Sequence, residues 1–435
     1  MFLFFTTNVL SHAKSKPINA NPQSFAFIHV TIIDATGAPP KRNMTVIIRG
    51  VRIATIGKTS TTRLRRNVRA VDATGMFLIP GLWDMHVHIG DNNFDRDAYL
   101  SLFVANGVTG IRIMDGLPEH HLWRREIEEG TLLGPRMVIA SRIIDGPTSY
   151  LSGVVIVSDA FEARQAAQKA KQAGADFLKI HDKVPRDAYF ALIKEAKLLG
   201  LPVAGHVPES VTALEASNAG QRSIEHLTGL DEAISDTHKA DLLLATFKRN
   251  HTWNCPTLIM RHNYASLQNP SLINDPRLKY TKASWRLRWG RVAVEAGTWP
   301  ADEAKNRKAI IEKQDALVGK IQRAGLGILA GTDDGNPYVI PGFSLHDELG
   351  LLVGSGLTPL QALQAATINP AKFLKQASSL GTVRKGRLAD LVLLNANPLK
   401  DIRNTTRIEA VVNNGQYFDR ASLDKILRRV EKTAN

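Results

Sequence analysis

Side chains of the types that bind divalent metals stand at the ends of several apolar, strand-like segments. His86 and His88 follow the apolar run 77–83. Two histidines at positions i and i+2 of a strand point to the same side, so both imidazoles could meet one cation. A single His-x-His pair also arises by chance. The pair indicates a metal site only together with its place at the end of a predicted strand.

Lys179 lies inside the apolar segment 177–181, where burial of an unpaired ammonium group is costly. A neutral amine there could react with CO₂, and the resulting carbamate has two oxygens that could bridge two divalent ions about 3.5 to 4 Å apart, as two-metal hydrolases require. The alternative is a lysine whose aliphatic stem packs while its head reaches solvent. The residues alone leave both interpretations open.

Three further candidates end later apolar segments. His206 follows Lys179 by 27 residues and His226 follows His206 by 20, and each interval fits one strand and one helix. Asp333 ends a late segment that begins at Ile328, where it could act as a metal ligand and a general base.

The elements that must position these side chains appear as alternating apolar runs and helical patterns. Helices are predicted at 160–173, 187–199 and 210–219, each followed by glycine, with strands at 176–180 and 201–206. Such units recur over roughly 270 residues, near the length typical of a (β/α)₈ barrel, whose active site lies at the carboxyl ends of the strands. A doubly wound open sheet is the alternative, but the early Gly-x-Gly-x-x-Gly turn that it needs is absent.

Short strands punctuated by glycine and proline occupy both ends of the chain. They are predicted at 26–33, 45–49 and 51–56 and again at 386–394 and 408–415. We therefore predict an α/β protein with a TIM barrel at 79–365 and a small composite β-sandwich domain built from both termini, 25–78 and 366–425.

The first 24 residues are interpreted as a signal-like or disordered tail. Residues 1–10 are mostly apolar, and Ser11-His12-Ala13 is a site at which an export signal could be cut, although a basic leader is missing. Export to the periplasm and a cytoplasmic location both stay open. No apolar run approaches the roughly 20 residues of a membrane-spanning helix, so no transmembrane segment is predicted.

The composition narrows the class of partner. The chain has 435 residues, 44% of them hydrophobic, and a formal net charge of +14. This excess of positive charge suits a small-molecule substrate that carries a carboxylate. The basic residues are scattered along the chain and do not form the clusters typical of nucleic-acid-binding proteins. Cys255 is the single cysteine and cannot form an internal disulfide or a thiolate metal site alone. We expect a small-molecule substrate, no nucleic-acid partner and, as an open possibility, a homo-oligomer.

Taken together, the candidate residues resemble the amidohydrolase superfamily. The resemblance covers nearly the whole chain. It rests on His86-x-His88, Lys179, His206, His226 and Asp333 in that order, and on the segments 78–84, 204–208, 223–227, 330–333, 365–371 and 381–391.

The resemblance implies a barrel with a composite β-sandwich and two divalent ions, usually zinc. His86, His88 and Asp333 would bind the more buried ion, His206 and His226 the more exposed ion, and carboxylated Lys179 would bridge the two. A hydroxide held between the ions would attack the substrate carbonyl, and Asp333 would carry its proton to the leaving amine.

Within the superfamily, the chain is similar to the prolidase-like branch that is often labelled imidazolonepropionase-like. This similarity implies hydrolysis of an amide bond in a dipeptide or an N-acyl amino acid. Arginines within 285–291 suit an anionic substrate, and His181, His262 and Tyr264 are the candidate substrate contacts. The chain departs from many relatives at 141–147, where it lacks their Gly-Gly-His run.

Other reactions remain open for the same residues. A cyclic-amide, lactone or phosphotriester hydrolase could use the same dinuclear centre. A mononuclear hydrolytic deaminase could use Glu209 as its proton shuttle, because His206 and Glu209 fit an H-x-x-E spacing. Lys179 weighs against a deaminase, which needs no bridging carbamate. A barrel that only binds a partner is disfavoured because all six ligands are present.

Overall fold

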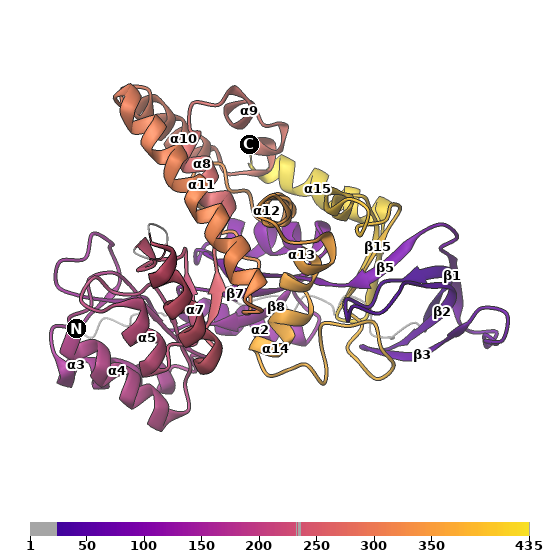
Figure 1. The fold of residues 1–435 in the computed structure, drawn as a ribbon. Helices are drawn as coiled ribbons and strands as arrows, with labels where there is room; N and C mark the ends of the chain where they lie inside the picture. The colour runs from indigo at the N-terminus through magenta and orange to yellow at the C-terminus, as the bar shows by residue number, and fades with distance from the viewer. Residues whose placement is uncertain (1–23, 232, 234–235, 435) are drawn as a thin grey trace, which may run out of the picture.

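The computed structural model describes residues 24–231, 233 and 236–434. Except for Ser24, the predicted signal-like segment lies outside the described residues. The chain forms a mixed α/β fold, as predicted, in which long helices flank centrally placed strands (Figure 1). None of the helices in the described ranges has the length and apolar character that a membrane span requires.

One sheet of eight strands joins the two ends of the chain. Its order is β17-β16-β15-β5-β1-β2-β3, with β4 paired to β1. The antiparallel pairing of β15 with β5 makes the connection between the ends. The strands are β1 (Phe25–Ile32), β2 (Lys41–Arg49), β3 (Arg52–Lys58), β4 (Arg69–Asp72), β5 (Phe77–Pro80), β15 (Leu391–Leu394), β16 (Ile408–Asn413) and β17 (Gln416–Asp419).

The middle strands of this sheet bury both of their faces. Along β15, Leu391 and Leu393 pack into a hydrophobic cluster with Phe27, whereas Val392 and Leu394 pack into the main core. Successive side chains of a strand point to opposite faces, so a strand that is buried on both sides is apolar throughout. The main core therefore continues from this sheet into the middle of the molecule.

The middle of the chain supplies two parallel sheets, with the orders β6-β7-β8 and β10-β9-β11-β12-β13-β14. Single bridges extend the pairing, from Ala140 to Phe177 and from Asn254 to Ile328. The Met85 N–H donates to the Ala330 carbonyl at 2.9 Å. The strands are β6 (Leu82–Val87), β7 (Val108–Ile113), β8 (Arg136–Ile139), β9 (Ile144–Asp145), β10 (Val155–Ile156), β11 (Leu178–Ile180), β12 (Val203–Gly205), β13 (Ser223–Glu225) and β14 (Trp253–Cys255).

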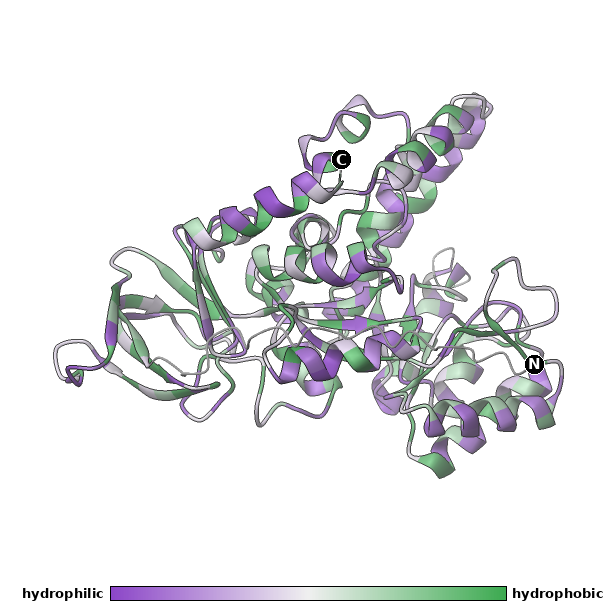
Figure 2. Cartoon of the chain, turned by 180° about the vertical axis from the view of Figure 1, so that it is seen from behind, coloured by the Kyte–Doolittle hydropathy of each residue, from purple (hydrophilic) through white to green (hydrophobic). Residues whose placement is uncertain are grey.

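Helices follow most of these strands. In Figure 2 the inner strands are largely green, whereas the long helices carry purple and green in turn, as expected of helices with one buried face. The α-helices are α1 (Leu100–Ala105), α2 (Pro118–Glu128), α3 (Ala160–Gln172), α4 (Arg186–Leu199), α5 (Ala213–Ala219), α7 (Thr237–Asn250), α8 (Leu258–Ala265), α9 (Pro270–Ile273), α10 (Ala283–Ala296), α11 (Ala301–Arg323), α12 (Phe343–Gly354), α13 (Pro359–Ala365), α14 (Ile368–Phe373) and α15 (Arg420–Ala434). The short helices are η1 (Asp95–Tyr99), η2 (Pro276–Tyr280) and η3 (Ile402–Thr406).

The three helices predicted around the middle strands are present. Helices α3 and α4 agree with the predicted ranges to within a residue. Helix α5 begins later than predicted, at Ala213, because Thr212 and Glu215 form a capping box that fixes its first turn. Gly220 then ends α5 in the left-handed conformation, as predicted for a terminal glycine.

Gly205 lets two neighbouring strands approach closely at the point where His206 leaves β12. It has a φ of +135°, and a Cβ atom added there would lie 2.2 Å from the carbonyl oxygen of Ile180 in β11. The His206 N–H donates to that same oxygen at 3.1 Å. Glycine is therefore required by both backbone conformation and space.

We expect Gly205→Ala to destabilise the protein by at least ~3 kcal/mol, because the added Cβ meets backbone atoms in a conformation that L-residues avoid. Gly200→Ala is the matched control. Gly200 has a φ of +68°, but no atom of the described residues lies within 4 Å of an added Cβ, so only the conformational cost of about 1–2 kcal/mol applies. Urea denaturation would measure both, and equal losses would contradict the close approach of β11 and β12.

Candidate metal centre

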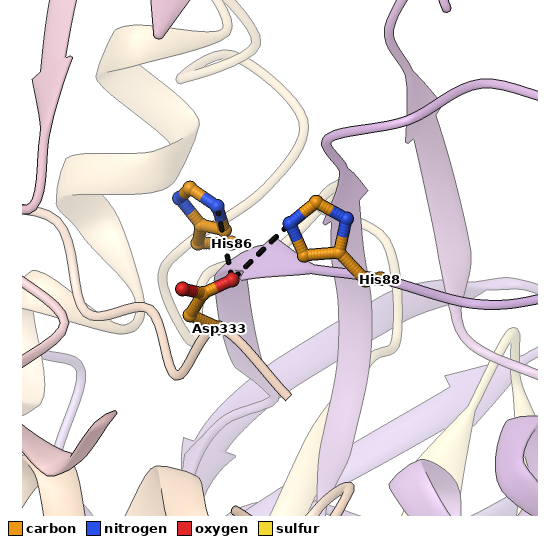
Figure 3. A group of neighbouring side chains, drawn as sticks. All are labelled: His86, His88 and Asp333. Atoms are coloured by element: carbon orange, nitrogen blue, oxygen red, sulfur yellow. Dashed lines mark ion pairs between the residues drawn. The ribbon is translucent and has the colours of Figure 1, made fainter. Parts of the chain in front are cut away.

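Three of the predicted ligands meet at the end of β6. Nε2 of His88 lies 3.1 Å and Nε2 of His86 lies 3.4 Å from the same oxygen of Asp333, Oδ1 (Figure 3). The potential ligand atoms of the three side chains all lie within 4.8 Å of one another. One small cation could therefore contact all three, as the His-x-His spacing predicts.

Hydrogen bonds on both sides of Asp333 tie its loop to β6. The Thr332 N–H donates to Oδ1 of Asp84 at 3.0 Å, and the His88 N–H donates to Oδ1 of Asp334 at 2.6 Å. The Asp333 N–H itself donates to the His86 carbonyl at 2.8 Å. Residues distant in the chain are thus held at a fixed separation by the backbone.

Three of the histidines use Nδ1 for a structural contact, which directs Nε2 elsewhere. The partners of Nδ1 are Glu225 Oε2 at 2.9 Å for His86, Asp182 Oδ1 at 2.6 Å for His206, and Thr257 Oγ1 at 2.6 Å for His226. Histidines that bind metals are held in this way through their second nitrogen.

The Nε2 atom of His86 is the clearest sign of a missing partner. It is buried and has no hydrogen-bond partner among the described residues, although Asp333 Oδ1 is 3.4 Å away. Leaving a buried polar nitrogen without a partner costs free energy. A divalent metal ion fits this donor set of imidazole nitrogen and carboxylate oxygen.

The remaining predicted ligands lie against the same place. The ring centroids of His226 and His86 are 4.5 Å apart, and those of His206 and His226 are 4.9 Å apart. Lys179 is 1% exposed and lines one cavity together with His88, His206, His226 and Asp333. The structure therefore gathers all six predicted ligands, with the fully buried His86 behind the cavity wall.

Burial lowers the pKa of several basic groups of this site. It lowers the pKa of His86 to about 4 and the pKa of His206 to about 3. It also lowers the pKa of Lys179, although the charges of Glu225 and Asp333 oppose the change. Neutral imidazoles and a neutral amine are the forms that metal binding and carbamate formation need.

For the Asp333 carboxyl group, neighbouring side chains affect the pKa more strongly than burial does. Burial alone would raise the pKa of its carboxyl group, but the electrostatic interaction with His86 and the hydrogen bond with His88 outweigh burial and hold the pKa below its usual range. The group is therefore a carboxylate at neutral pH. It can bind a cation or accept a proton.

A buried ion pair behind His86 was missed by the sequence analysis. Nη2 of Arg112 lies 2.8 Å from both carboxylate oxygens of Glu225, and both side chains are fully buried. Arg112 also donates from Nε to the Met85 carbonyl at 2.6 Å. Because Glu225 contacts His86 Nδ1, the pair fixes the orientation of that imidazole. The available signal was an arginine inside the apolar strand β7, comparable to Lys179 in β11.

Two of the three predicted substrate contacts line the cavity. His181 stacks near His206, with ring centroids 4.1 Å apart, and its Nδ1 lies 3.2 Å from Asp145 Oδ2. Asp145 belongs to the segment 141–147, which the sequence comparison with the superfamily singled out above. The Tyr264 hydroxyl lies 3.2 Å from Asn336 Oδ1 in the cavity wall.

The structure does not bring His262 to the cavity. Its Nε2 contacts Asp315 of α11 at 3.1 Å, and His262 is not among the lining residues of the described chain. On α8 the cavity is lined by Met260, Arg261 and Tyr264, whose spacing places them on one helical face. Position 262 falls on the other face.

Glu209, which the deaminase alternative requires, lies outside the group of lining residues in the described chain. Its side chain is 68% exposed and forms an ion pair with Lys183. It is therefore engaged at the surface rather than directed at His206.

The cavity itself has a volume of about 1050 Å³. Its wall combines aromatic and basic side chains beside the candidate ligands, among them Tyr150, Trp285, Arg261, Arg288 and Lys282. Trp285 and Arg288 belong to the basic segment that the sequence analysis linked to an anionic substrate.

Comparison with known proteins places the chain among hydrolases. Residues 77–417 match the model of the amidohydrolase family. Ochratoxinase from Aspergillus niger is 24% identical over 434 residues, which span 86% of this chain and 82% of that protein. An adenine deaminase from Rubrobacter xylanophilus is 25% identical over 395 residues, but these span 87% of this chain and 55% of that protein.

Two solved structures that superpose on the chain also carry the names of hydrolases. A bottromycin amidohydrolase superposes with a TM-score of 0.78 at 25% identity and covers 96% of this chain and 92% of its own. A putative prolidase from Bifidobacterium longum superposes with a TM-score of 0.74 at 25% identity, over 94% of this chain and 99% of its own.

We expect Glu225→Gln to destabilise the metal-free protein by about 3–5 kcal/mol, because it leaves the Arg112 guanidinium buried without a compensating charge. The control is Glu303→Gln, which removes a half-exposed pair with Arg307 on α11 and should cost less than about 0.5 kcal/mol. Chemical denaturation measures both. Similar losses of stability for the two variants would show that the buried ion pair matters no more for the free energy of unfolding than the half-exposed pair.

Proposed function

The chain belongs to the amidohydrolase family of hydrolytic enzymes, which act on C–N bonds, and we propose that it cleaves an amide bond in a dipeptide or an N-acyl amino acid with two divalent metal ions. Similarity to a bottromycin amidohydrolase and to a structure described as a putative prolidase supports an amide substrate. The basic cavity wall supports a substrate that carries a carboxylate.

The single observation that carries the metal proposal is the buried Nε2 atom of His86, which has no hydrogen-bond partner within the described part of the chain and faces the Asp333 carboxylate. A cation between these atoms would satisfy both. Nitrogen-rich sites of this kind suit zinc, so zinc is the proposed metal.

The proposed ligand assignment follows the neighbours of each side chain. His86, His88 and Asp333 would hold the more buried ion, because their ligand atoms lie within 4.8 Å of one another. His206 and His226 would hold the second ion, and Lys179, carboxylated by CO₂, would bridge the two. The lowered pKa and deep burial of Lys179 support a neutral amine at that position.

Two bound divalent ions would polarise the substrate carbonyl and acidify the attacking water. The chain's own part is to hold and move a proton. Asp333 is a carboxylate with Oδ1 beside His86 and His88 and Oδ2 3.7 Å from His226 Nε2. We propose that Asp333 accepts the proton of the attacking water and delivers it to the leaving nitrogen. His181 and Tyr264 would contact the substrate from the cavity wall.

We also propose how the strands and helices are arranged into two domains. Continuous backbone pairing supports a closed barrel: Ala140 pairs with Phe177, Asn254 pairs with Ile328, and the Met85 N–H returns to the Ala330 carbonyl. We propose a (β/α)₈ barrel at 79–365 and a composite β-sandwich domain at 25–78 and 366–425. The mixed-terminus sheet around β5 and β15 supports the second unit.

The same centre could open a cyclic amide or cleave a lactone or a phosphotriester, and substrate panels distinguish these reactions. The deaminase alternative draws on the adenine deaminase similarity. The surface position of Glu209 and its pairing with Lys183 speak against the proton shuttle that this alternative needs.

We expect the purified enzyme to contain two metal ions per chain and Lys179→Ala to lose most of them. Its turnover should fall by more than the roughly 100-fold typical of changes outside the ligand shell. Lys183→Ala, which removes a partly exposed lysine nearby, is the control and should retain metal and activity. Elemental analysis and assays of dipeptides and N-acyl amino acids give both readouts. A Lys179→Ala enzyme with full metal content and turnover would contradict the dinuclear centre.

A further inference from the structure

Arg261 is a basic side chain of the cavity wall that has no role in the proposed metal centre. It lies on α8, which starts directly after β14 and presents Met260, Arg261 and Tyr264 to the cavity. Its Nη2 donates to the backbone carbonyl of His226 at 2.8 Å. Arg261 is therefore anchored beside a proposed ligand of the second ion.

The Arg261 guanidinium has hydrogen-bonding capacity to spare. A guanidinium presents several N–H donors in a planar fork, and the carbonyl of His226 is the acceptor that the structure records for it. Its Nε is buried without a hydrogen-bond partner among the described residues. The carboxylates of Asp333, Asp231 and Asp182 act on its charge through space, but no hydrogen bond from Arg261 to them is present in the described chain. An anionic ligand would satisfy the free donors.

The other positively charged side chains of the cavity wall are paired with a carboxylate, exposed to solvent or assigned to the proposed metal centre. Lys282 forms an ion pair with the buried Asp95 and contacts Asn92 Oδ1 at 3.1 Å. Arg288 is exposed and donates to the Gly335 carbonyl at 2.8 Å. Lys179 is the proposed bridge between the ions. Among the described residues of the wall, Arg261 is thus an inner cation that keeps donors available for an anionic ligand.

We propose that Arg261 binds the free carboxylate of the substrate and thereby selects amides that carry one. The inference rests on the proposed function and deepens it. A planar guanidinium matches a carboxylate in a two-point contact and stays charged at all working pH values. Because Arg261 is fixed to the backbone of His226, a carboxylate bound to it keeps the neighbouring amide at the metal centre.

The test compares matched substrates, namely the N-acetyl amino acids that the wild type hydrolyses and the same compounds with the carboxylate converted to a carboxamide. We expect the wild type to prefer the acid by about 10- to 100-fold in kcat/KM, the range of one hydrogen bond to a charged group. Arg261→Met should lose this preference, because its activity on the acid should fall by about 10- to 100-fold more than its activity on the carboxamide. Arg288→Met should keep the preference.

Two further readouts separate this role from a structural one. Metal content of Arg261→Met should equal that of the wild type, and Arg261→Lys should restore part of the acid preference. Calorimetry with N-acetyl-L-phenylalanine and its amide gives the same comparison without turnover, so failure of the proposed hydrolysis and failure of the inference can be told apart. Retained acid preference in Arg261→Met, equal loss on acid and carboxamide, or a wild type without acid preference would overturn the proposal.

Discussion

The cost of burying polar atoms without partners is the constraint on which this site depends. His86 is fully buried, its Nδ1 is satisfied by Glu225, and its Nε2 faces a charged Asp333 without a hydrogen bond. Burial also lowers the pKa of His86 and His206, so these two imidazoles are neutral and their lone pairs are available. An arrangement of neutral nitrogens around a buried carboxylate is stable when a cation completes it, and the metal-dependent activity proposed for the chain follows from that requirement.

The fold meets this constraint with parts that are far apart in sequence. Strand β6 supplies His86, the loop at Asp333 is hydrogen bonded to it through Asp84 and Asp334, and Gly205 lets β12 deliver His206 beside β11. The buried Arg112–Glu225 pair then holds His86 from behind. Such a pair adds little net stability, but removing one partner leaves a buried charge, so the pair is best understood as a device that fixes the geometry of the site.

Residue type and local spacing were sufficient to predict the ligand candidates and the alternation of strands and helices. Each of the six residues ends or interrupts an apolar segment, and glycines at 200 and 220 mark helix ends. Spacing did not reveal partners that meet only after folding, such as Arg112 and Glu225, which are 113 residues apart. Spacing also did not reveal which face of α8 lines the cavity. Arg261 lines the cavity and His262 contacts Asp315, whereas the sequence analysis selected His262 as a substrate contact. The hydrophobic pattern alone also placed the start of α5 too early, because the capping box at Thr212 fixes the first turn of this helix.

The central claim is that two metal ions are held by His86, His88, Lys179, His206, His226 and Asp333. Crystals of the zinc-loaded enzyme, measured on both sides of the zinc absorption edge, test it most directly. The account predicts two anomalous peaks about 3.5 to 4 Å apart, one among His86, His88 and Asp333 and one at His206 and His226, with added density on Lys179 Nζ between them. A lone peak, peaks away from these side chains, or an unmodified Lys179 turned from the metals would contradict it.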